Sequence, residues 1–363
     1  MVAAVEGMNR AESTQRTPRT QRKIRFGLLS FVSFVSLVSI GIGVSCGRTT
    51  NEDARHVRIA VGGQNQMVYL PTTLAQELGF YKEEGIDAEL QDFAGGAKSL
   101  QALVGGSADV VSGFYDHTIQ MAAEGREIVA FVTMLRFPGL VLVTSPQSAA
   151  TVTTVADVKG HIAGVTTAGS SSQMLLTSIL QRNGVAADAV SITAIGSAAT
   201  AIAALEHGKV DVGMVADPAF TLIRRRNPGV RVLADLRTAE GVSAALGAHA
   251  YPASVLYAPG DWIRAHRDTT ERLARAITRT LAWMQSHTPE DIASKMPKML
   301  RGDDDALYVE ALRASMPMFS PDGLMLAEGA EVVRTQLASS MEKVRTSTID
   351  VSKTYTNEFI RGR

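Results

Sequence analysis

A motif that occurs twice constrains the fold of this chain more than any other feature. The pattern Ala-Leu-x-x-Gly-x-x-Asp-Val covers residues 102–110 and returns at 204–212. In each copy an Ala- and Leu-rich helical run ends at a glycine, which adopts the left-handed conformation at little cost, and a β-branched run follows. Each copy therefore predicts a helix-to-strand junction, with Asp109 and Asp211 fixing the turn before the strand. Although any single αβ unit can give one copy, two copies predict two similar α/β lobes, with a ligand site in the cleft between them.

Composition supports a globular body large enough for two lobes. The 363 residues are 45% hydrophobic and 20% charged, which is ample for two domains. Residues 1–45 carry six basic and two acidic side chains, which leaves 30 basic and 34 acidic residues in the remainder. The body is thus mildly acidic and shows no basic stripe, so nucleic acid is not expected as a partner.

The N-terminal region has the pattern of an export signal. Several arginines and a lysine precede an uncharged apolar run over 26–47, as in the n- and h-regions of a secretory signal. The run contains Gly43-Val44-Ser45-Cys46, which resembles a bacterial lipobox, although leucine is usual at the position of Gly43. We therefore expect export to the periplasm or cell surface, with a lipid anchor on Cys46. An uncleaved membrane anchor is the alternative, because the run approaches the roughly 18 residues that span a bilayer.

The sequence offers little for metal or covalent chemistry. Cys46 is the only cysteine, so the body has no disulfide, thiolate metal site or cysteine nucleophile. The seven histidines show no i, i+4 pairing, and the body contains no P-loop, G-x-G-x-x-G or G-x-S-x-G motif. We expect no metal, no cofactor and no enzymatic activity.

Strands and helices alternate after residue 57. Apolar runs at 57–61, 86–90 and from 110 onward, separated by helical segments, predict a βαβαβ unit with parallel strands. A similar series begins at 161. The expected organisation is a leader over 1–46, a linker over 47–56, a first lobe over 57–146 and 250–363, and a second lobe over 147–249. These bounds put a strand at 139–144 in the first lobe. The chain then passes between the lobes twice, near 145–148 and near 248–251, and we call these two passages the crossings. The helical pattern over 261–363 is expected to pack on the first lobe.

A cluster of hydroxyl groups is the first candidate ligand site. Gly169, Ser170, Ser171 and Ser172 follow a predicted strand and begin a predicted helix. Hydroxyls and free backbone N–H groups at such a place suit an anionic or electronegative ligand group. The alternative is a simple helix cap, which any helix needs.

Polar side chains at the two repeated strand ends are the second candidate. Tyr115 and Asp116 follow the first repeated strand, and Asp217 follows the second. If the lobes face each other, a carboxylate there accepts N–H groups from an amine or heterocycle, and Tyr115 stacks on a flat ligand. Asp217 precedes a proline and is equally consistent with a turn. The amides of Gln64 and Gln66 are further candidates, or else belong to a surface loop.

The chain resembles a known family, the periplasmic substrate-binding proteins of bacterial ABC importers, of the sulfonate, nitrate, taurine and thiamine-precursor type. The resemblance covers about residues 57–290. It rests on Leu70-Pro71-x3-Ala75-x2-Leu78-Gly79-Phe80-Tyr81-Lys82-x2-Gly85-Ile86, on the two copies of the repeated motif, and on Gly169-Ser170-Ser171. It implies a type II periplasmic binding protein-like α/β fold, in which two lobes joined by a hinge close on a small solute for delivery to a permease.

The resemblance implies a monomeric solute receptor, and two alternatives stay open. A membrane-tethered enzyme or a sensor would use the same two-lobe fold. The sequence places no arginine or lysine securely at a strand end, so an organic solute with one anionic group or a polar ring is expected in preference to a dianion.

Overall fold

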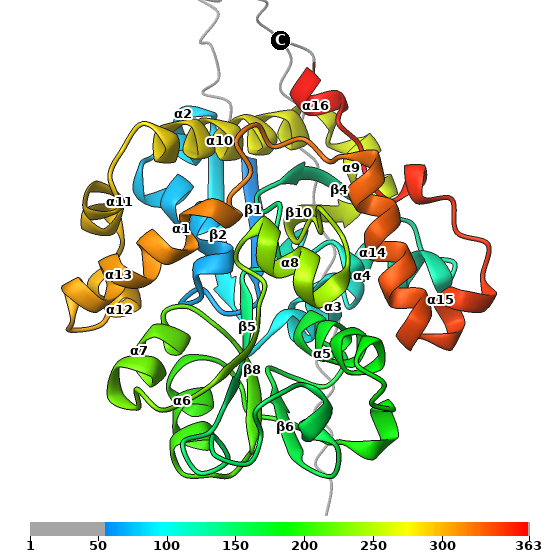
Figure 1. Ribbon diagram of the computed structural model, residues 1–363. Coiled ribbons are helices and arrows are strands. Elements are labelled where there is room, and N and C mark those ends of the chain that lie inside the picture. Colours follow the sequence, from blue (N-terminus) through cyan, green and yellow to red (C-terminus); the bar gives the residue numbers. More distant parts are fainter. Residues whose placement is uncertain (1–54, 362–363) are drawn as a thin grey trace, which may run out of the picture. The chain divides into compact units, whose positions relative to one another are not determined.

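The structure of the protein is a computed structural model that describes residues 55–361 (Figure 1). The predicted leader with Cys46 and all but two residues of the predicted linker 47–56 lie outside the described residues. Over residues 55–361, no helix is long and apolar enough to cross a membrane.

The first sheet has five strands in the order β2-β1-β3-β10-β4. Its strands are β1 (Arg55–Val61), β2 (Ile86–Asp92), β3 (Val110–Phe114), β4 (Ile128–Thr133) and β10 (Ser254–Pro259). The helices between its first four strands are α1 (Leu70–Glu77), α2 (Phe80–Glu83), α3 (Gly96–Val104) and α4 (Asp116–Ala123). Because β1 pairs in parallel with both β2 and β3, this part of the sheet is the expected βαβαβ unit.

The second sheet also has five strands, in the order β7-β6-β8-β5-β9. Its strands are β5 (Leu140–Thr144), β6 (Ile162–Val165), β7 (Ser191–Ala194), β8 (Val212–Ala216) and β9 (Val232–Asp235). The helices in this part of the chain are α5 (Ser171–Arg182), α6 (Ala198–Glu206), α7 (Ala219–Arg226) and α8 (Ala239–Leu246). Here β6 is parallel to β7 and β8. The predicted α/β fold with two similar lobes is confirmed.

Each sheet is completed by one antiparallel strand next to a crossing of the chain. β10 runs antiparallel to β3 and β4, and β5 runs antiparallel to β8 and β9. The assignment of the strand at 139–144 to the first lobe is therefore wrong. Its sequence, Leu-Val-Leu-Val-Thr, is buried throughout, and such a run fits the middle of either sheet. The first crossing lies at 134–139, before the predicted segment 145–148, and the second lies between α8 and β10, where it was expected.

The two repeated junctions have the same geometry. The glycine that ends each helix has a positive φ, +76° in the first copy and +63° in the second. Asp109 donates its backbone N–H to the Arg58 carbonyl, and its carboxylate accepts the Arg58 N–H in return. Asp211 forms the same pair of bonds with Ile162. Both aspartates hold the start of one strand to its parallel neighbour, whereas the prediction was that they fix the turn before the strand.

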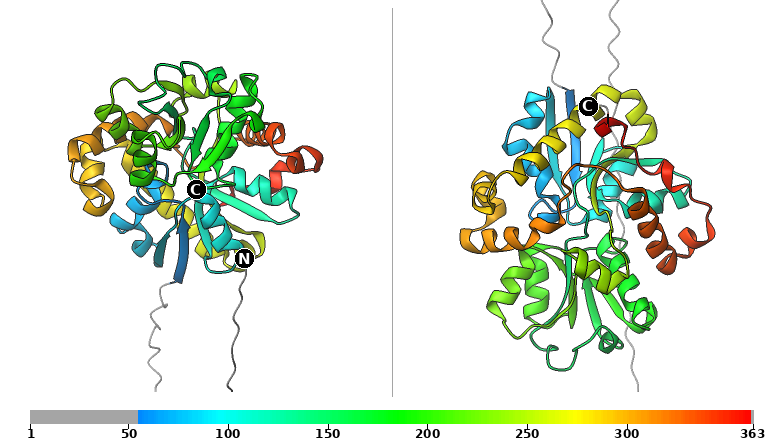
Figure 2. Two further views of the ribbon diagram at one scale, coloured as in Figure 1. Left: turned by 90° about the horizontal axis from the view of Figure 1, so that it is seen from below. Right: turned by 45° about the horizontal axis from the view of Figure 1, so that its top comes forward.

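The C-terminal third is helical, as expected, and it does not pack on the first lobe alone. Its helices are α9 (Gly260–Ala265), α10 (Arg267–Gln285), α11 (Pro289–Lys295), α12 (Lys298–Arg301), α13 (Asp305–Ser315), α14 (Ala327–Ser340), α15 (Glu342–Thr346) and α16 (Glu358–Arg361). Short 3-10 helices lie at Met67–Tyr69, Ala156–Val158, Ala187–Ala189, Met316–Met318 and Val351–Lys353. α13 contacts α7, and α14 contacts α5, from opposite sides of the molecule (Figure 2). These two helices thus also pack against the second lobe, whereas the prediction placed the C-terminal helices on the first lobe alone.

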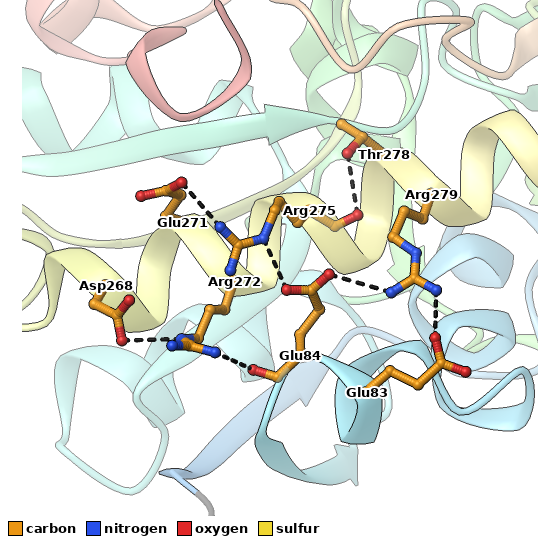
Figure 3. Close-up of polar contacts among 8 residues, drawn as sticks. All are labelled: Glu83, Glu84, Asp268, Glu271, Arg272, Arg275, Thr278 and Arg279. Carbon is orange, nitrogen blue, oxygen red and sulfur yellow. Dashed lines mark hydrogen bonds and ion pairs between the residues drawn. The ribbon is translucent and has the colours of Figure 1, made fainter. Parts of the chain in front are cut away.

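α10 is held on the first lobe by an ion-pair network (Figure 3). The Glu84 carboxylate accepts from Arg275 Nε at 2.7 Å and from Arg279 Nη1 at 3.2 Å. Arg272 donates to the Glu84 carbonyl at 3.1 Å, and the Arg279 guanidinium lies 4.3 Å from the Phe80 ring centre. Single surface pairs contribute little, but a shared carboxylate that is only 13% exposed makes this a network that fixes α10 on α2.

Candidate functional site

A small cavity lies between the two sheets, at the carboxyl ends of their parallel strands. Its lining residues are Gly62, Gln66, Tyr69, Gly96, Phe114, Leu140, Thr166, Ser170, Ser171 and Ser172. We call it the inner cavity. Its volume of ≈ 20 Å³ takes a group about the size of one water molecule. Both lobes contribute to its wall, as the cleft prediction required.

A second pocket adjoins the inner cavity and shares Gln66 and Thr166 with it. This tip pocket, of ≈ 10 Å³, reaches Asp217 and Pro218 after β8 and the start of α6 at Ser197. Gln66 connects the two, because its side chain lines both pockets and its Nε2 donates to the Gly62 carbonyl at 2.8 Å.

The serine cluster forms part of the inner cavity wall. Ser172 Oγ accepts the Thr166 N–H at 3.0 Å and lies 2.8 Å from Ser170 Oγ. Ser170 is the N-cap residue of α5, yet its side chain makes no capping bond. Gly169 has a φ of +74° and does not line the inner cavity. The hydroxyls thus lie in the site, while the simple-cap alternative lacks the bond that would support it.

Asp116 lies behind the serine cluster, fully buried. Its Oδ1 accepts from Ser171 Oγ at 2.7 Å, across the boundary between the lobes. Its Oδ2 has no hydrogen-bond partner among the described residues. Burial raises the pKa of Asp116 to about 7, against the lowering effect of hydrogen bonds from Ser171 and the His117 N–H. This carboxyl therefore changes its charge near neutral pH.

His117 follows Asp116 and forms the layer beneath the cavity floor. Its Nδ1 lies 3.1 Å from the Tyr257 hydroxyl, and its Nε2 has no partner among the described residues. Burial lowers the pKa of His117 to about 4, so the ring is neutral at physiological pH. A Cβ at Gly96 would lie 3.1 Å from the imidazole, which explains the glycine at this point of close approach.

Asp217, at the equivalent strand end of the second lobe, is surrounded by donors. Oδ2 accepts from Arg237 Nη1 at 2.8 Å and from Ser315 Oγ at 3.2 Å, and Oδ1 accepts from Thr221. Arg237 also holds Asp235 with two nitrogens. Burial opposes the charge of Arg237, but its bonds to Asp235 and Asp217 raise its pKa above the ordinary value.

Sequence reasoning missed Arg237, which corrects the expectation that no arginine lies at a strand end. Arg237 is two residues beyond the end of β9, and its side chain is only 9% exposed. The available signal in the sequence was an aspartate, Asp235, two residues before this arginine, which is close enough for an ion pair. Arg237 is occupied by two carboxylates and does not line either pocket, so it supports Asp217 from behind.

Tyr115 and Gln64 do not line the site. The Tyr115 hydroxyl pairs with Thr354 Oγ1 at 2.5 Å, and its ring packs edge-on against Tyr355, away from the cavity. The predicted stacking role of Tyr115 is therefore contradicted. Gln64 is on the outer side of the loop after β1, where its N–H donates to Asp92 at 2.8 Å. The aromatic rings that do line the inner cavity are Tyr69 and Phe114, an edge-to-face pair with centres 6.1 Å apart; sequence analysis named neither as a site residue.

Hydrogen bonds join the lobes at the site, and that of Ser315 to Asp217 is one of them. Ser171 of the second lobe donates to Asp116 of the first, and the Met67 N–H of the first lobe donates to the Asp217 carbonyl at 2.9 Å. The two repeated strand ends thus lie on opposite sides of the same cleft. Within residues 55–361, no cluster of histidine, cysteine, aspartate and glutamate side chains has the arrangement of a metal site.

Comparison with protein families gives one match over most of the folded body. The family model described as "NMT1/THI5 like" matches residues 66–291. A relative, the putative binding protein YtlA of Bacillus subtilis (strain 168), is 20% identical over 286 residues, which are 77% of this chain and 81% of YtlA.

Solved structures share the fold. A protein of Bordetella bronchiseptica RB50 is 36% identical, with a TM-score of 0.80 over 85% of this chain and 96% of that one. The alkanesulfonate-binding protein SsuA of Xanthomonas axonopodis pv. citri, bound to MOPS, is 18% identical, with a TM-score of 0.67 over 83% of this chain and 98% of that one. The periplasmic nitrate-binding protein NrtA of Synechocystis PCC 6803 is 12% identical, with a TM-score of 0.64 over 85% of this chain and 87% of that one.

Proposed function

The chain belongs to the NMT1/THI5-like family, and from that premise we propose that it is an extracytoplasmic solute-binding receptor. It captures a small organic solute between its lobes and delivers it to the permease of an ABC importer. The observation that carries the proposal is the inner cavity, which is walled by both lobes and bridged by the bond between Ser171 and Asp116. Structural neighbours with this fold bind alkanesulfonates and nitrate, which supports a receptor and not an enzyme.

The chemistry of the cavity wall supports a solute with one small polar or singly charged group. Hydroxyls of Thr166, Ser170 and Ser172 and the amide of Gln66 donate and accept hydrogen bonds, and no lysine or arginine is among the lining residues. A dianion would bury two charges without a counterion here, which is costly. A sulfonate, a carboxylate or a polar ring needs only hydrogen bonds of the kind that these residues offer.

The decisive test uses the natively exported protein. Mass spectrometry of the purified protein identifies the small molecule that it carries, and that molecule is then added back to stripped protein. We expect a smaller radius of gyration in solution scattering, a higher melting temperature, and recovery of the molecule unchanged. A molecule that is consumed would favour the tethered-enzyme alternative, and binding without compaction would contradict the receptor proposal.

We also propose that the protein is a monomer held at the membrane by a lipid on Cys46. The Cys46→Ser variant should lose metabolic labelling with a fatty acid and should release the body from membranes. Labelling that survives the substitution would contradict the lipid anchor, and a body that stays on the membrane without labelling would favour the uncleaved anchor.

A further inference from the structure

The two faces of the second sheet differ in how they meet the first lobe. One face is covered by α5 and α8, and its apolar side chains, such as Leu142 and Met214, belong to a cluster that continues through the core of the first lobe. The other face is covered by α6 and α7. Its apolar side chains, such as Val143 and Val215, form a separate cluster that consists of second-lobe residues. Among the described residues, the buried apolar core therefore passes between the lobes on the α5 side alone.

The helix α14 joins the two lobes on this continuous side. Its buried side chains Ala330, Val333 and Leu337 belong to the shared cluster, and α14 contacts both α5 of the second lobe and α4 of the first. The Gln336 side chain donates to the Leu246 carbonyl at 3.0 Å, at the end of α8, where the second crossing begins. Separating the lobes here would expose apolar surface to water, which is unfavourable.

The bonds across the opposite side are polar. Figure 1 shows α7 and α13 next to each other there, away from α5 and α14. Arg225 of α7 donates from Nη1 to Asp304 at 2.9 Å and from Nη2 to Glu310 at 3.1 Å, and the two acids lie at the start of α13 and within it. The side chains of Arg225 and of both acids are between 43% and 56% exposed, so water readily replaces these bonds when the lobes part.

Arg225 is the middle one of three consecutive arginines at the end of α7, and its neighbours have partners within the second lobe. The Arg224 guanidinium lies 5.8 Å from the ring centre of Phe220, and Arg226 pairs with Glu206 at 3.5 Å. Among the described residues, Arg225 is the only one of the three that bonds to the first lobe. This arginine run thus supplies one side chain that bridges the lobes and two of the same type that do not.

The lobes must part before a solute can enter. The inner cavity and the tip pocket measure ≈ 20 and ≈ 10 Å³, which is about the size of one water molecule each. The tip pocket lies on the α7 side, because Ala201 and Val215 in its wall also belong to the second-lobe cluster. Parting on this side would therefore open the tip pocket first, and then the inner cavity, with which it shares Gln66 and Thr166.

We infer that the lobes turn about the side held by α14 and part at the side of α7 and α13, where Arg225, Asp304 and Glu310 form a latch that stabilises the closed form. The inference rests on the proposed receptor function and adds the direction of opening and the route by which the solute enters. Arg225 is a positioning residue, since it acts on the closed form without lining either pocket.

The test measures distances between spin labels by pulsed electron spin resonance. It uses the full chain with Cys46→Ser, in which the introduced cysteines are the only ones. The outer label pair, Arg226→Cys on α7 and Ala306→Cys on α13, spans the proposed opening. The inner label pair, Arg182→Cys on α5 and Ser339→Cys on α14, spans the proposed hinge. All four positions are exposed.

In protein stripped of solute, we expect the outer pair to show the distance of the closed form together with a longer one, and the inner pair to keep a single distance. Arg225→Gln should raise the ratio of long to short outer distances roughly two- to fivefold, because exposed ion pairs add only a small stabilisation. High salt should raise this ratio in wild type and change it less in the variant. Arg224→Gln is the matched control and should leave the ratio unchanged.

Either of two results would overturn the inference. The first is an inner pair whose distance changes as much as that of the outer pair, which would place the hinge elsewhere. The second is an outer pair whose distances are the same with and without Arg225→Gln, or are changed equally by Arg224→Gln, which would remove the latch.

The same labels separate this inference from the receptor proposal. If the solute that co-purifies shortens both label pairs alike, the receptor function stands and the assignment of hinge and latch fails. If no solute co-purifies and the outer pair alone still responds to Arg225→Gln, the latch stands and the receptor proposal loses its support.

Discussion

The two repeated strands are each followed by a buried aspartate, and the two aspartates have very different hydrogen-bond partners. Asp116, after β3, is fully buried with one donor side chain, Ser171, and no cation bonded to it among the described residues. Asp217, after β8, is equally buried and is bound by Arg237, Thr221 and Ser315. The two copies of the repeat therefore share their backbone geometry, whereas the side chains that bind each aspartate come from segments outside the repeat.

The two aspartates therefore have different roles at the cleft. The bonds of Asp217 fix the tip of the second lobe, because Arg237, Thr221 and Ser315 all hold its carboxylate in place. Asp116 has a single donor side chain, Ser171, and burial raises its pKa to about 7.

The largest effect is expected from Arg237→Met. The substitution leaves Asp217 and Asp235 without their guanidinium partner, and breaking a buried pair in this way costs about 3–5 kcal/mol of the free energy of unfolding. Urea unfolding followed by circular dichroism measures it. Arg264→Met is the control, because its pair with Glu127 is exposed and should contribute little to stability. Similar losses in both variants would remove the proposed difference between the two acids.

A somewhat smaller effect is expected from Asp116→Asn, and it depends on pH. The folded-state pKa of Asp116 is raised from 3.8 to about 7. Between these pH values the carboxyl is protonated in the folded protein and ionised in the unfolded chain, so the free energy of unfolding falls as pH rises through this range. The loss by pH 8 is roughly 2–4 kcal/mol. The asparagine side chain cannot ionise, so the variant should lack this loss. Parallel stability curves for wild type and variant from pH 4 to 8 would show that Asp116 has an ordinary pKa.

The bond between Ser171 and Asp116 should couple the lobes more weakly. Ser171→Ala removes the donor and is expected to cost about 1–2 kcal/mol of folding stability. A double-mutant cycle with Asp116→Asn isolates the pair, and a coupling energy near zero would mean that the bond does not form.

When Ser170 and Ser171 are both replaced by alanine, affinity for the co-purified solute should fall roughly five- to hundredfold.

The smallest effects are expected at the junctions. Asp109→Asn and Asp211→Asn keep an oxygen that accepts the neighbouring strand's N–H, so each should cost only about 0.5–1.5 kcal/mol. Thermal unfolding should show a somewhat larger shift for Asp109→Asn, because Asp109 also accepts from the Arg58 guanidinium at 2.7 and 3.0 Å, whereas Asp211 has His161 in that place. A shift several times larger at one junction would indicate that the repeat is not equivalent in the two lobes.

The parts of the fold that sequence could predict are those set by local backbone geometry. The glycine and aspartate of each junction act within a few residues of the chain or on the adjacent strand, so their pattern alone was sufficient. The place of the serine run 170–172, between a strand and a helix, was also predicted, whereas its role in ligand binding stays a prediction.

The failures have a common physical cause, which is distance along the chain. Tyr115 turns away from the cleft because its hydroxyl pairs with Thr354, 239 residues later. The strand β5 joins the second sheet because of partners on β8 and β9, and its uniformly apolar sequence favoured neither sheet. No pattern within a short window contains information of that kind.

The antiparallel strand in each sheet has a consequence for how the chain is made. Once residue 250 has left the ribosome, every strand of the second sheet is outside it, whereas β10, which joins β3 to β4 in the first sheet, is not. The lobe that begins first is therefore the lobe that is finished last. Until residues 254–259 emerge, β3 and β4 present open edges to which another strand can add. These edges are the part of the unfinished first sheet that a chaperone would have to cover, and they close when β10 arrives.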